Sequence, residues 1–261
     1  MNYHIQGLLV FALGAAVGSF LNVVRYRLPR HMGLVADRSR CPGCNHAISW
    51  YDNIPILSFF VLKRHCRWCG WRIPWIYFVI EVSTAIGFLL VWRAFPVSEI
   101  APYWVFVSIA VACAGIDYDL RLIPDRLTLP GLVAGFVFAL TLLRDASVES
   151  ALLHAVLGLA AGGGSLYLIS WLYKVVRGVE GMGGGDIKFM AMVGVFLGYK
   201  LALLTIFTAS VVGGIIGLLL MRRSPDGIRS TVPFGVFLSP AAVFSLIWGE
   251  RLISAYVSLI R

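Results

Sequence analysis

The sequence predicts an all-α membrane protein with about eight transmembrane helices and one small hydrophilic domain. Of its 261 residues, 59% are hydrophobic and 13% are charged, whereas soluble domains are about 45–50% apolar and about 25% charged. Apolar segments recur along the chain, and several are long enough to cross a bilayer. The one large hydrophilic segment, 25–74, contains two Cys-x-x-Cys pairs, and a domain of this size needs such a staple.

Eight apolar segments mark the expected helices. The first has no charged residue and lacks the basic n-region and small-residue cleavage site of a signal peptide, so we expect a retained helix. The sixth is short for a full span. The segments are 5–24, 75–92, 102–118, 127–143, 151–173, 187–199, 201–221 and 233–249. We therefore divide the chain into a first helix (1–24), a hydrophilic domain (25–74) and a seven-helix bundle (75–261).

The basic residues indicate the orientation in the membrane. With eight spans, connecting segments alternate between the two sides, and 17 of the 22 lysines and arginines fall on one side, in 25–74, 117–127, 174–188 and 222–232. Basic loops remain in the cytoplasm, so we expect these segments there and both termini outside. The net charge of +9 has the same origin. We therefore expect this chain to contact membrane lipid and not nucleic acid. The basic and aromatic residues around the cysteine pairs are likewise expected to contact lipid headgroups.

Isolated residues within the apolar segments have structural interpretations. Glu81 interrupts the second segment and should face the bundle interior or water, because a carboxylate in lipid is unfavourable. Cys113 is expected in the core. Three glycine pairs have the spacing of close helix–helix contacts: Gly14 and Gly18, Gly158 and Gly162, and Gly213 and Gly217.

The four remaining cysteines predict a metal site. Cys41 and Cys44 form one Cys-x-x-Cys pair, and Cys66 and Cys69 form the other. Two such pairs at this separation are typical of a zinc ion held by four thiolates. Because four thiolates close the coordination shell, we interpret the zinc as structural. In the cytoplasm these thiols would be reduced, which argues against disulfides.

Two aspartates are candidates for catalysis. Asp117 ends the third segment, and Asp186 begins the sixth after the glycine-rich stretch 181–185. The topology places both at the cytoplasmic edge of the bilayer, where a carboxylate pair can hold a water between them and act as acid and base. Glycines before Asp186 would let a substrate backbone approach. A loop or cap role for the pair stays open, and Asp125 is expected to cap the fourth helix.

Combined motifs make the chain resemble bacterial type IV prepilin leader peptidases, also called prepilin peptidase/N-methyltransferases. The glycine-x-glycine-aspartate motif alone would be weak evidence, because other intramembrane aspartyl proteases share it; the combination of motifs is specific. One departure from the family pattern is Val236 after Pro-Phe-Gly, where many members have proline, and we expect no effect on chemistry. The matching stretches are 18–24, 27–29, the cysteine quartet around 48–55, 116–117, 122–129, 183–188 and 233–235.

The resemblance implies the activity and the partners. It implies that Asp117 and Asp186 are the catalytic pair, that the enzyme lies in the inner membrane, and that it cleaves the basic leader of prepilins or pseudopilins on the cytoplasmic side. It also implies methylation of the new N-terminal residue from S-adenosylmethionine. No soluble-type fold for that donor is visible, so its site is unassigned, and we expect it near 25–74, the only hydrophilic region of any size.

Two other function classes remain alternatives at this stage. A zinc or cation transporter would use Asp117, Asp186 and Glu81 along its path, and it should carry carboxylates at mid-depth on several helices. A membrane scaffold with a zinc-holding domain would need no catalytic residues. The gathering of carboxylates at one edge favours the peptidase over both.

Overall fold

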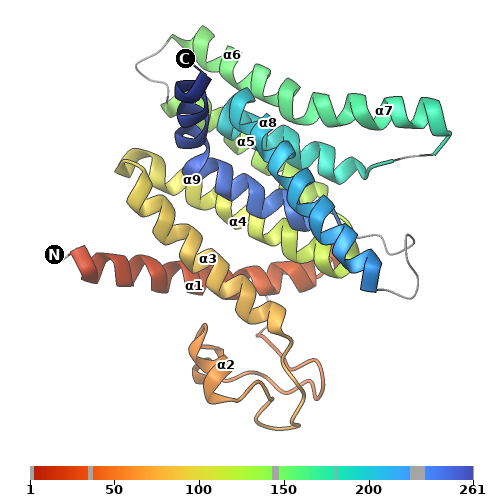
Figure 1. The fold of residues 1–261 in the computed structure, drawn as a ribbon. Coiled ribbons are helices and arrows are strands. Elements are labelled where there is room, and N and C mark those ends of the chain that lie inside the picture. The colour runs from red at the N-terminus through yellow and green to blue at the C-terminus, as the bar shows by residue number, and fades with distance from the viewer. Residues whose placement is uncertain (1–2, 35–37, 143–146, 180, 224–232, 261) are drawn as a thin grey trace. The chain divides into compact units, whose positions relative to one another are not determined.

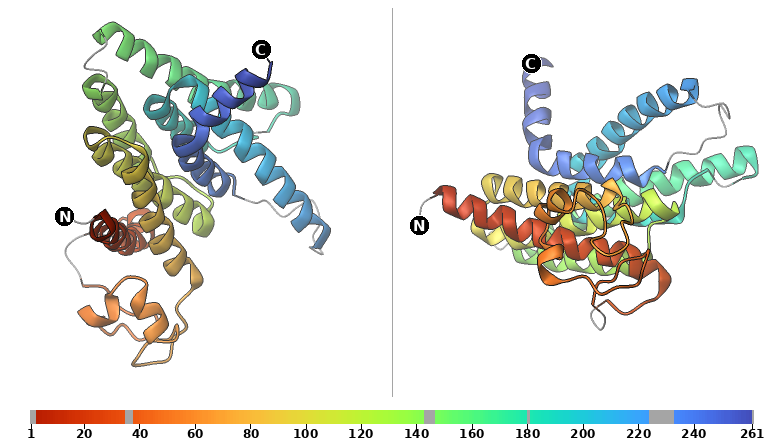
Figure 2. Two further views of the ribbon diagram at one scale, coloured as in Figure 1. Left: turned by 60° about the vertical axis from the view of Figure 1, so that its left-hand side comes forward. Right: turned by 90° about the horizontal axis from the view of Figure 1, so that it is seen from below.

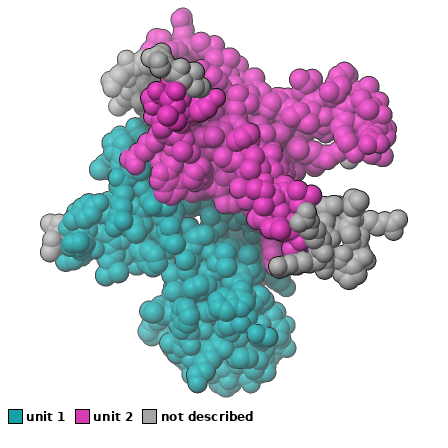
Figure 3. All heavy atoms as spheres, viewed as in Figure 1, with its two compact units in different colours: residues 1–115 teal, residues 116–261 magenta. Residues whose placement is uncertain are grey.

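The computed structural model describes residues 3–34, 38–142, 147–179, 181–223 and 233–260. The described residues form helices and connecting segments, with two isolated β-bridges and no strand. The chain divides into two compact units, residues 1–115 and 116–261, which Figure 3 shows in different colours. The prediction of an all-α membrane protein is confirmed.

The first unit is built on α1 (Tyr3–Arg27) and α3 (Trp75–Ala94), which pack against each other (Figures 1 and 2). Their close approach depends on glycine, as the spacing predicted. A Cβ atom on Gly14 would lie 2.7 Å from the Cα atom of Ala85, and one on Gly18 would lie 2.7 Å from that of Glu81. Most of α4 (Val97–Leu120) also belongs to this unit, where Cys113 is fully buried as expected.

The described part of the segment between α1 and α3 contains only short helices. These are η1 (Leu28–Arg30), η2 (Trp50–Asn53) and α2 (Leu57–Val61). The four predicted zinc ligands lie on the loops around them. A segment of this length with so little regular structure depends on side-chain contacts and on its cysteine cluster for stability.

The second unit begins at the end of α4 and contains the remaining helices. The contact between α6 and α8 is made by glycines, because a Cβ atom on Gly158 would overlap the carbonyl of Gly194. Gly162, in the π-helical turn, lies equally close to the carbonyl of Met190. The elements are α5 (Asp125–Leu142), α6 (Val148–Leu159), the π-helical η3 (Ala160–Gly164), α7 (Ser165–Arg177), α8 (Gly184–Arg223) and α9 (Gly235–Ile260).

The expected segments and the observed helices agree in place but not in number. Among the described residues, six helical runs are long and apolar enough to cross a membrane: Tyr3–Arg30, Trp75–Ala94, Val97–Leu120, Val148–Arg177, Gly184–Leu220 and Gly235–Leu259. Predicted segments six and seven are merged in α8, which is interrupted at Gly198 by a non-helical backbone with φ 78°. Predicted segment four corresponds to α5.

The third glycine pair makes a close contact at Gly213 but not at Gly217. A Cβ atom on Gly213 would lie 3.2 Å from the ring of Phe237, which is a close contact. Around Gly217, however, no atom of the described residues lies within 4 Å of such a Cβ position. Spacing alone does not say which face of a helix meets a neighbour.

Part of the loop expected at 222–232 lies outside the described residues.

Candidate active site and metal centre

Asp117 and Asp186 come together within the second unit. Asp117 lies near the end of α4 and is 4% exposed. Asp186 lies in the first turn of α8 and is half-buried. The charge of Asp117 acts on the Asp186 carboxyl group, so the two groups are near enough to interact electrostatically. The structure therefore brings together the two residues that the sequence singled out.

The start of α9 holds one of these carboxylates in place. The backbone N–H of Val236 donates a hydrogen bond of 3.2 Å to Oδ2 of Asp117. The neighbouring Gly235 allows this approach, because a Cβ atom there would lie 2.8 Å from the same oxygen. Sequence analysis gave Val236 no role. A proline at this position would have no N–H to donate, so the departure from the family pattern gives Asp117 a hydrogen bond that proline cannot provide.

Glycines before Asp186 have different surroundings. A Cβ atom on Gly185 would lie 2.8 Å from the carbonyl oxygen of Ile123, so the space beside it is filled by this chain itself. At Gly184, no atom of the described residues lies within 4 Å of the Cβ position. The expectation that these glycines leave room for a substrate backbone therefore does not hold at Gly185, where glycine permits a contact between α8 and the segment that precedes α5.

Asp125 does not act as the expected helix cap. It is the first residue of α5, and the backbone N–H groups of Leu127 and Thr128 bond to the carbonyl of Pro124. The Asp125 carboxylate is instead bound by the Lys188 ammonium, with nitrogen–oxygen distances of 2.8 and 2.6 Å. A long-range partner thus replaces the local one that the sequence pattern favoured.

The two Cys-x-x-Cys pairs form hooks with the same backbone pattern. The N–H of Cys41 bonds to the carbonyl of His46, and that of Cys66 bonds to the carbonyl of Trp71. Four residues after the first cysteine of each hook, Asn45 and Gly70 have positive φ values of 58° and 70°. These are the residue types that tolerate this conformation best. The hooks are an internal repeat that sequence analysis did not detect.

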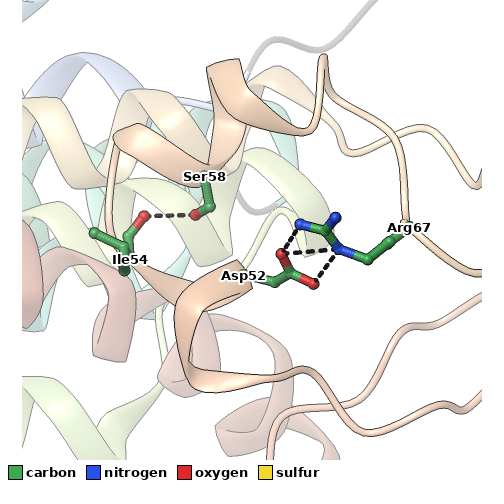
Figure 4. Close-up of polar contacts among 4 residues, drawn as sticks. All are labelled: Asp52, Ile54, Ser58 and Arg67. Carbon is green, nitrogen blue, oxygen red and sulfur yellow. Dashed lines mark hydrogen bonds and ion pairs between the residues drawn. The ribbon is translucent and has the colours of Figure 1, made fainter.

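Aromatic side chains pack one hook onto the other. The Trp68 ring lies 4.3 Å from the His46 ring, and a Cβ atom on Gly43 would lie 2.9 Å from Trp71. Arg67 binds Asp52 through both carboxylate oxygens, with a shortest distance of 2.6 Å (Figure 4). Arg67, Trp68 and Trp71, which the sequence assigned to lipid headgroups, therefore connect parts of the cysteine domain.

The four cysteine sulfurs have the arrangement that a metal ion needs. All lie within 4.8 Å of one another, and the sulfurs of Cys41 and Cys69 are 3.8 Å apart. Zinc–sulfur bonds of about 2.3 Å in a tetrahedron place the sulfurs about 3.8 Å apart. Hydrogen bonds from the backbone of Cys69 and Trp68 lower the pKa of Cys66 to about 7. The quartet therefore fits a tetrahedral metal, and one ligand is already predisposed to the thiolate form.

Comparison with known proteins identifies the family. The bacterial peptidase A24 N-terminal domain family matches residues 12–95, and the type IV leader peptidase family matches residues 104–218. The prepilin leader peptidase/N-methyltransferase of Pseudomonas putida is 32% identical over 97% of this chain and 94% of its own length. The chain belongs to the prepilin leader peptidase/N-methyltransferase family. The resemblance inferred from the motifs is thereby confirmed.

Other relatives cover the chain to the same extent. The prepilin leader peptidase/N-methyltransferase of Pseudomonas aeruginosa is 34% identical over 96% of this chain and 93% of its own length. The one from Aeromonas hydrophila is 33% identical over the same shares. None of the solved structures matches the chain. Family membership thus covers both units and favours the peptidase over the transporter and the scaffold.

Proposed function

We propose that this chain is an intramembrane aspartyl endopeptidase that removes the basic leader of type IV prepilins or pseudopilins, with Asp117 and Asp186 as its catalytic pair. The observation that carries the proposal is that these two carboxyl groups, one on α4 and one on α8, lie in one unit and near enough to interact electrostatically. The names of the related proteins support the substrate class.

The chemistry requires a carboxyl pair that shares one proton. The ionised carboxylate takes a proton from a water molecule while the water oxygen attacks the scissile carbonyl carbon. The protonated partner donates to the carbonyl oxygen, and a proton then passes to the leaving amine nitrogen as the carbon–nitrogen bond breaks. Burial of Asp117 supports this role, because a site shielded from bulk water strengthens each of these interactions.

The location of the reaction follows from the charge distribution. We place the active site at the cytoplasmic edge of the bacterial inner membrane, because the alternate connecting segments before α8, namely 25–74, 117–127 and 174–188, hold 14 of the 22 basic residues. A prepilin carries its leader in the cytoplasm and its apolar helix in the bilayer, so their junction would reach a carboxylate pair at that edge.

We also assign N-methylation of the new N-terminus and a structural zinc ion to this chain. The names of the relatives support methyl transfer, for which S-adenosylmethionine is the donor. The sulfur geometry supports a zinc ion bound by Cys41, Cys44, Cys66 and Cys69. On this proposal the zinc domain is 25–74 and the bundle from 75 to 261 carries the peptidase. Purified protein in detergent, incubated with a prepilin-like peptide, tests cleavage directly, and intact peptide would contradict the proposal.

A further inference from the structure

A cavity of about 500 Å³ lies wholly within the first unit. Its walls come from the second half of α1, the start of α3 and the cysteine domain between them. This volume is within the range of pockets that hold small molecules and cofactors. Several aromatic side chains line it, namely those of Tyr26, Phe59, Trp68, Trp71 and Tyr77.

One wall presents a buried acceptor without a partner. Asn22 lines the cavity and is 4% exposed. Its Nδ2 atom donates to the carbonyl oxygen of Tyr77 over 3.1 Å, which fixes the orientation of the amide. Its Oδ1 atom has no hydrogen-bond partner among the described residues. Because buried polar atoms are nearly always paired, this oxygen indicates a ligand that donates a hydrogen bond.

A carboxylate on the next helix completes the acceptor set. Glu81 also lines the cavity, and its Oε2 atom accepts a bond of 2.7 Å from the N–H of Ile56. The hydroxyl of Ser19 contacts the same carboxylate. Glu81 therefore faces the interior of the unit, which is one of the two surroundings expected for it. Two acceptors, one of them a carboxyl group, favour a ligand group with a positive charge and N–H donors at this wall. The cavity is also lined by arginines, which favour a negatively charged group on the same ligand: Arg27, Arg38, Arg40 and Arg67.

The close approach of the two helices creates this arrangement. Gly18 lets α1 touch the backbone of α3 at Glu81, with 2.7 Å between a Cβ position on Gly18 and the Glu81 Cα atom. Ser19 and Asn22 are then carried by α1 to the wall of the cavity. Gly18, which packs the two helices together, therefore also helps to build the polar end of the site.

We propose that this cavity binds the methyl donor S-adenosylmethionine, with Glu81 and Asn22 accepting from its ammonium group. The inference rests on the proposed methyl transfer and gives it a location. The donor combines two features that suit the lining: an amino-acid part with an ammonium group for the acceptors, and a flat adenine for the aromatic side chains. The other substrate of methyl transfer, the mature peptide, also has an N-terminal ammonium group. It carries no purine, so it matches the aromatic side chains less well.

Binding of the radiolabelled donor to the full-length protein in detergent tests this directly. Glu81→Gln keeps the shape and an acceptor for Ile56 but removes the charge, and Asn22→Ser removes the unpaired oxygen. Each is expected to weaken donor binding at least about tenfold. Glu99→Gln is the matched control, because Glu99 belongs to the same unit but does not line the cavity. All three variants should still cleave a prepilin-like peptide.

The outcomes separate this inference from the proposed function. If the wild-type protein binds the donor and both cavity variants bind it with unchanged affinity, the cavity is not the donor site. The proposed methyl transfer would still stand. Wild-type protein that neither binds donor nor methylates a precleaved peptide would overturn both. Loss of mature-peptide binding in Glu81→Gln, with donor binding intact, would assign the cavity to the peptide amine instead.

A second measurement does not depend on how the variants fold. An azidoadenosine analogue of the donor, activated by light on wild-type protein, should label peptides that contain residues lining the cavity, all of which fall between positions 19 and 81. Excess unlabelled donor should suppress the labelling. Suppressible labels found only in residues 116–261 would overturn the proposal.

Discussion

The Lys188 ammonium lies 2.6 Å from a carboxylate oxygen of Asp125 and so connects the first residue of α5 to the beginning of α8. The two partners lie close in sequence to the proposed catalytic pair: Asp125 comes eight positions after Asp117, and Lys188 comes two positions after Asp186. Their side chains are 51% and 45% exposed. Solvent therefore weakens this ion pair. We expect it to help hold the segment between α4 and α5 against the beginning of α8.

Asp125→Asn should reduce stability only slightly. Exposed ion pairs are worth about 0.2–1 kcal/mol, so a double-mutant cycle with Lys188→Gln, measured by unfolding in detergent, should give a coupling energy in that range. Cleavage should fall less than about tenfold, which corresponds to less than about 1.4 kcal/mol of barrier. Cleavage lost as completely as in Asp117→Asn would instead make Asp125 part of the catalytic machinery.

Asp117→Asn and Asp186→Asn should each reduce leader cleavage at least about 10²-fold, because a positioned acid or base contributes about 10²–10⁴-fold. The proteins should retain their thermal unfolding temperature and metal content. Asp119→Asn is the matched control, since Asp119 lies on the same helix but is exposed. Near-normal cleavage by either variant of the pair, measured on purified protein, would refute the assignment.

Gly184→Ala and Gly185→Ala should behave differently although they are adjacent. The Cβ atom added at Gly185 meets the Ile123 carbonyl oxygen at 2.8 Å, whereas no described atom lies within 4 Å of the one added at Gly184. Overpacking of this kind costs about 1–3 kcal/mol and would displace the beginning of α8. Gly185→Ala should therefore lower both stability and cleavage, and Gly184→Ala neither. Equal effects of the two substitutions on the cleavage assay would contradict the close contact.

Metal analysis should find about one zinc ion per chain, since four thiolates fill one tetrahedral shell. Cys69→Ser should release the metal and expose residues 25–74 to limited proteolysis before the helices. Cys113→Ser should leave the metal content unchanged, because Cys113 lies outside the cluster. Protons compete with zinc for thiolates, so metal should be lost as the pH falls. A metal-free protein that still protects this segment would argue against a structural zinc.

Asp117→Ala and Asp186→Ala should still methylate a peptide that begins at the mature N-terminal residue. The two carboxyl groups lie in the second unit, whereas the proposed donor cavity lies in the first. Substitution of the zinc ligands should reduce methylation at least as much as cleavage, because Cys41 and Cys66 belong to the cavity wall. A radiolabelled-methyl assay on precleaved peptide measures this. Loss of methylation in both aspartate variants, with folding and metal intact, would indicate one shared site.

The sequence by itself determined the features that depend on local patterns. Runs of apolar residues long enough for a bilayer identified the helices, because a backbone in lipid must satisfy its hydrogen bonds within the helix. The spacing within each cysteine pair identified the hooks, since two sulfurs three positions apart can reach one ion. Asp117 and Asp186 were identified by the motifs around them and by their place at helix ends.

Only the tertiary structure decided the contacts between distant residues. The bonds from Val236 to Asp117 and from Lys188 to Asp125, and the acceptor wall formed by Asn22 and Glu81, depend on which helix faces meet. The sequence pattern gave Asp125 a local cap and Gly217 a packing role, and both interpretations were wrong. The physical reason is that hydrophobic periodicity fixes the type of an element, whereas its neighbours are chosen by packing across the whole unit.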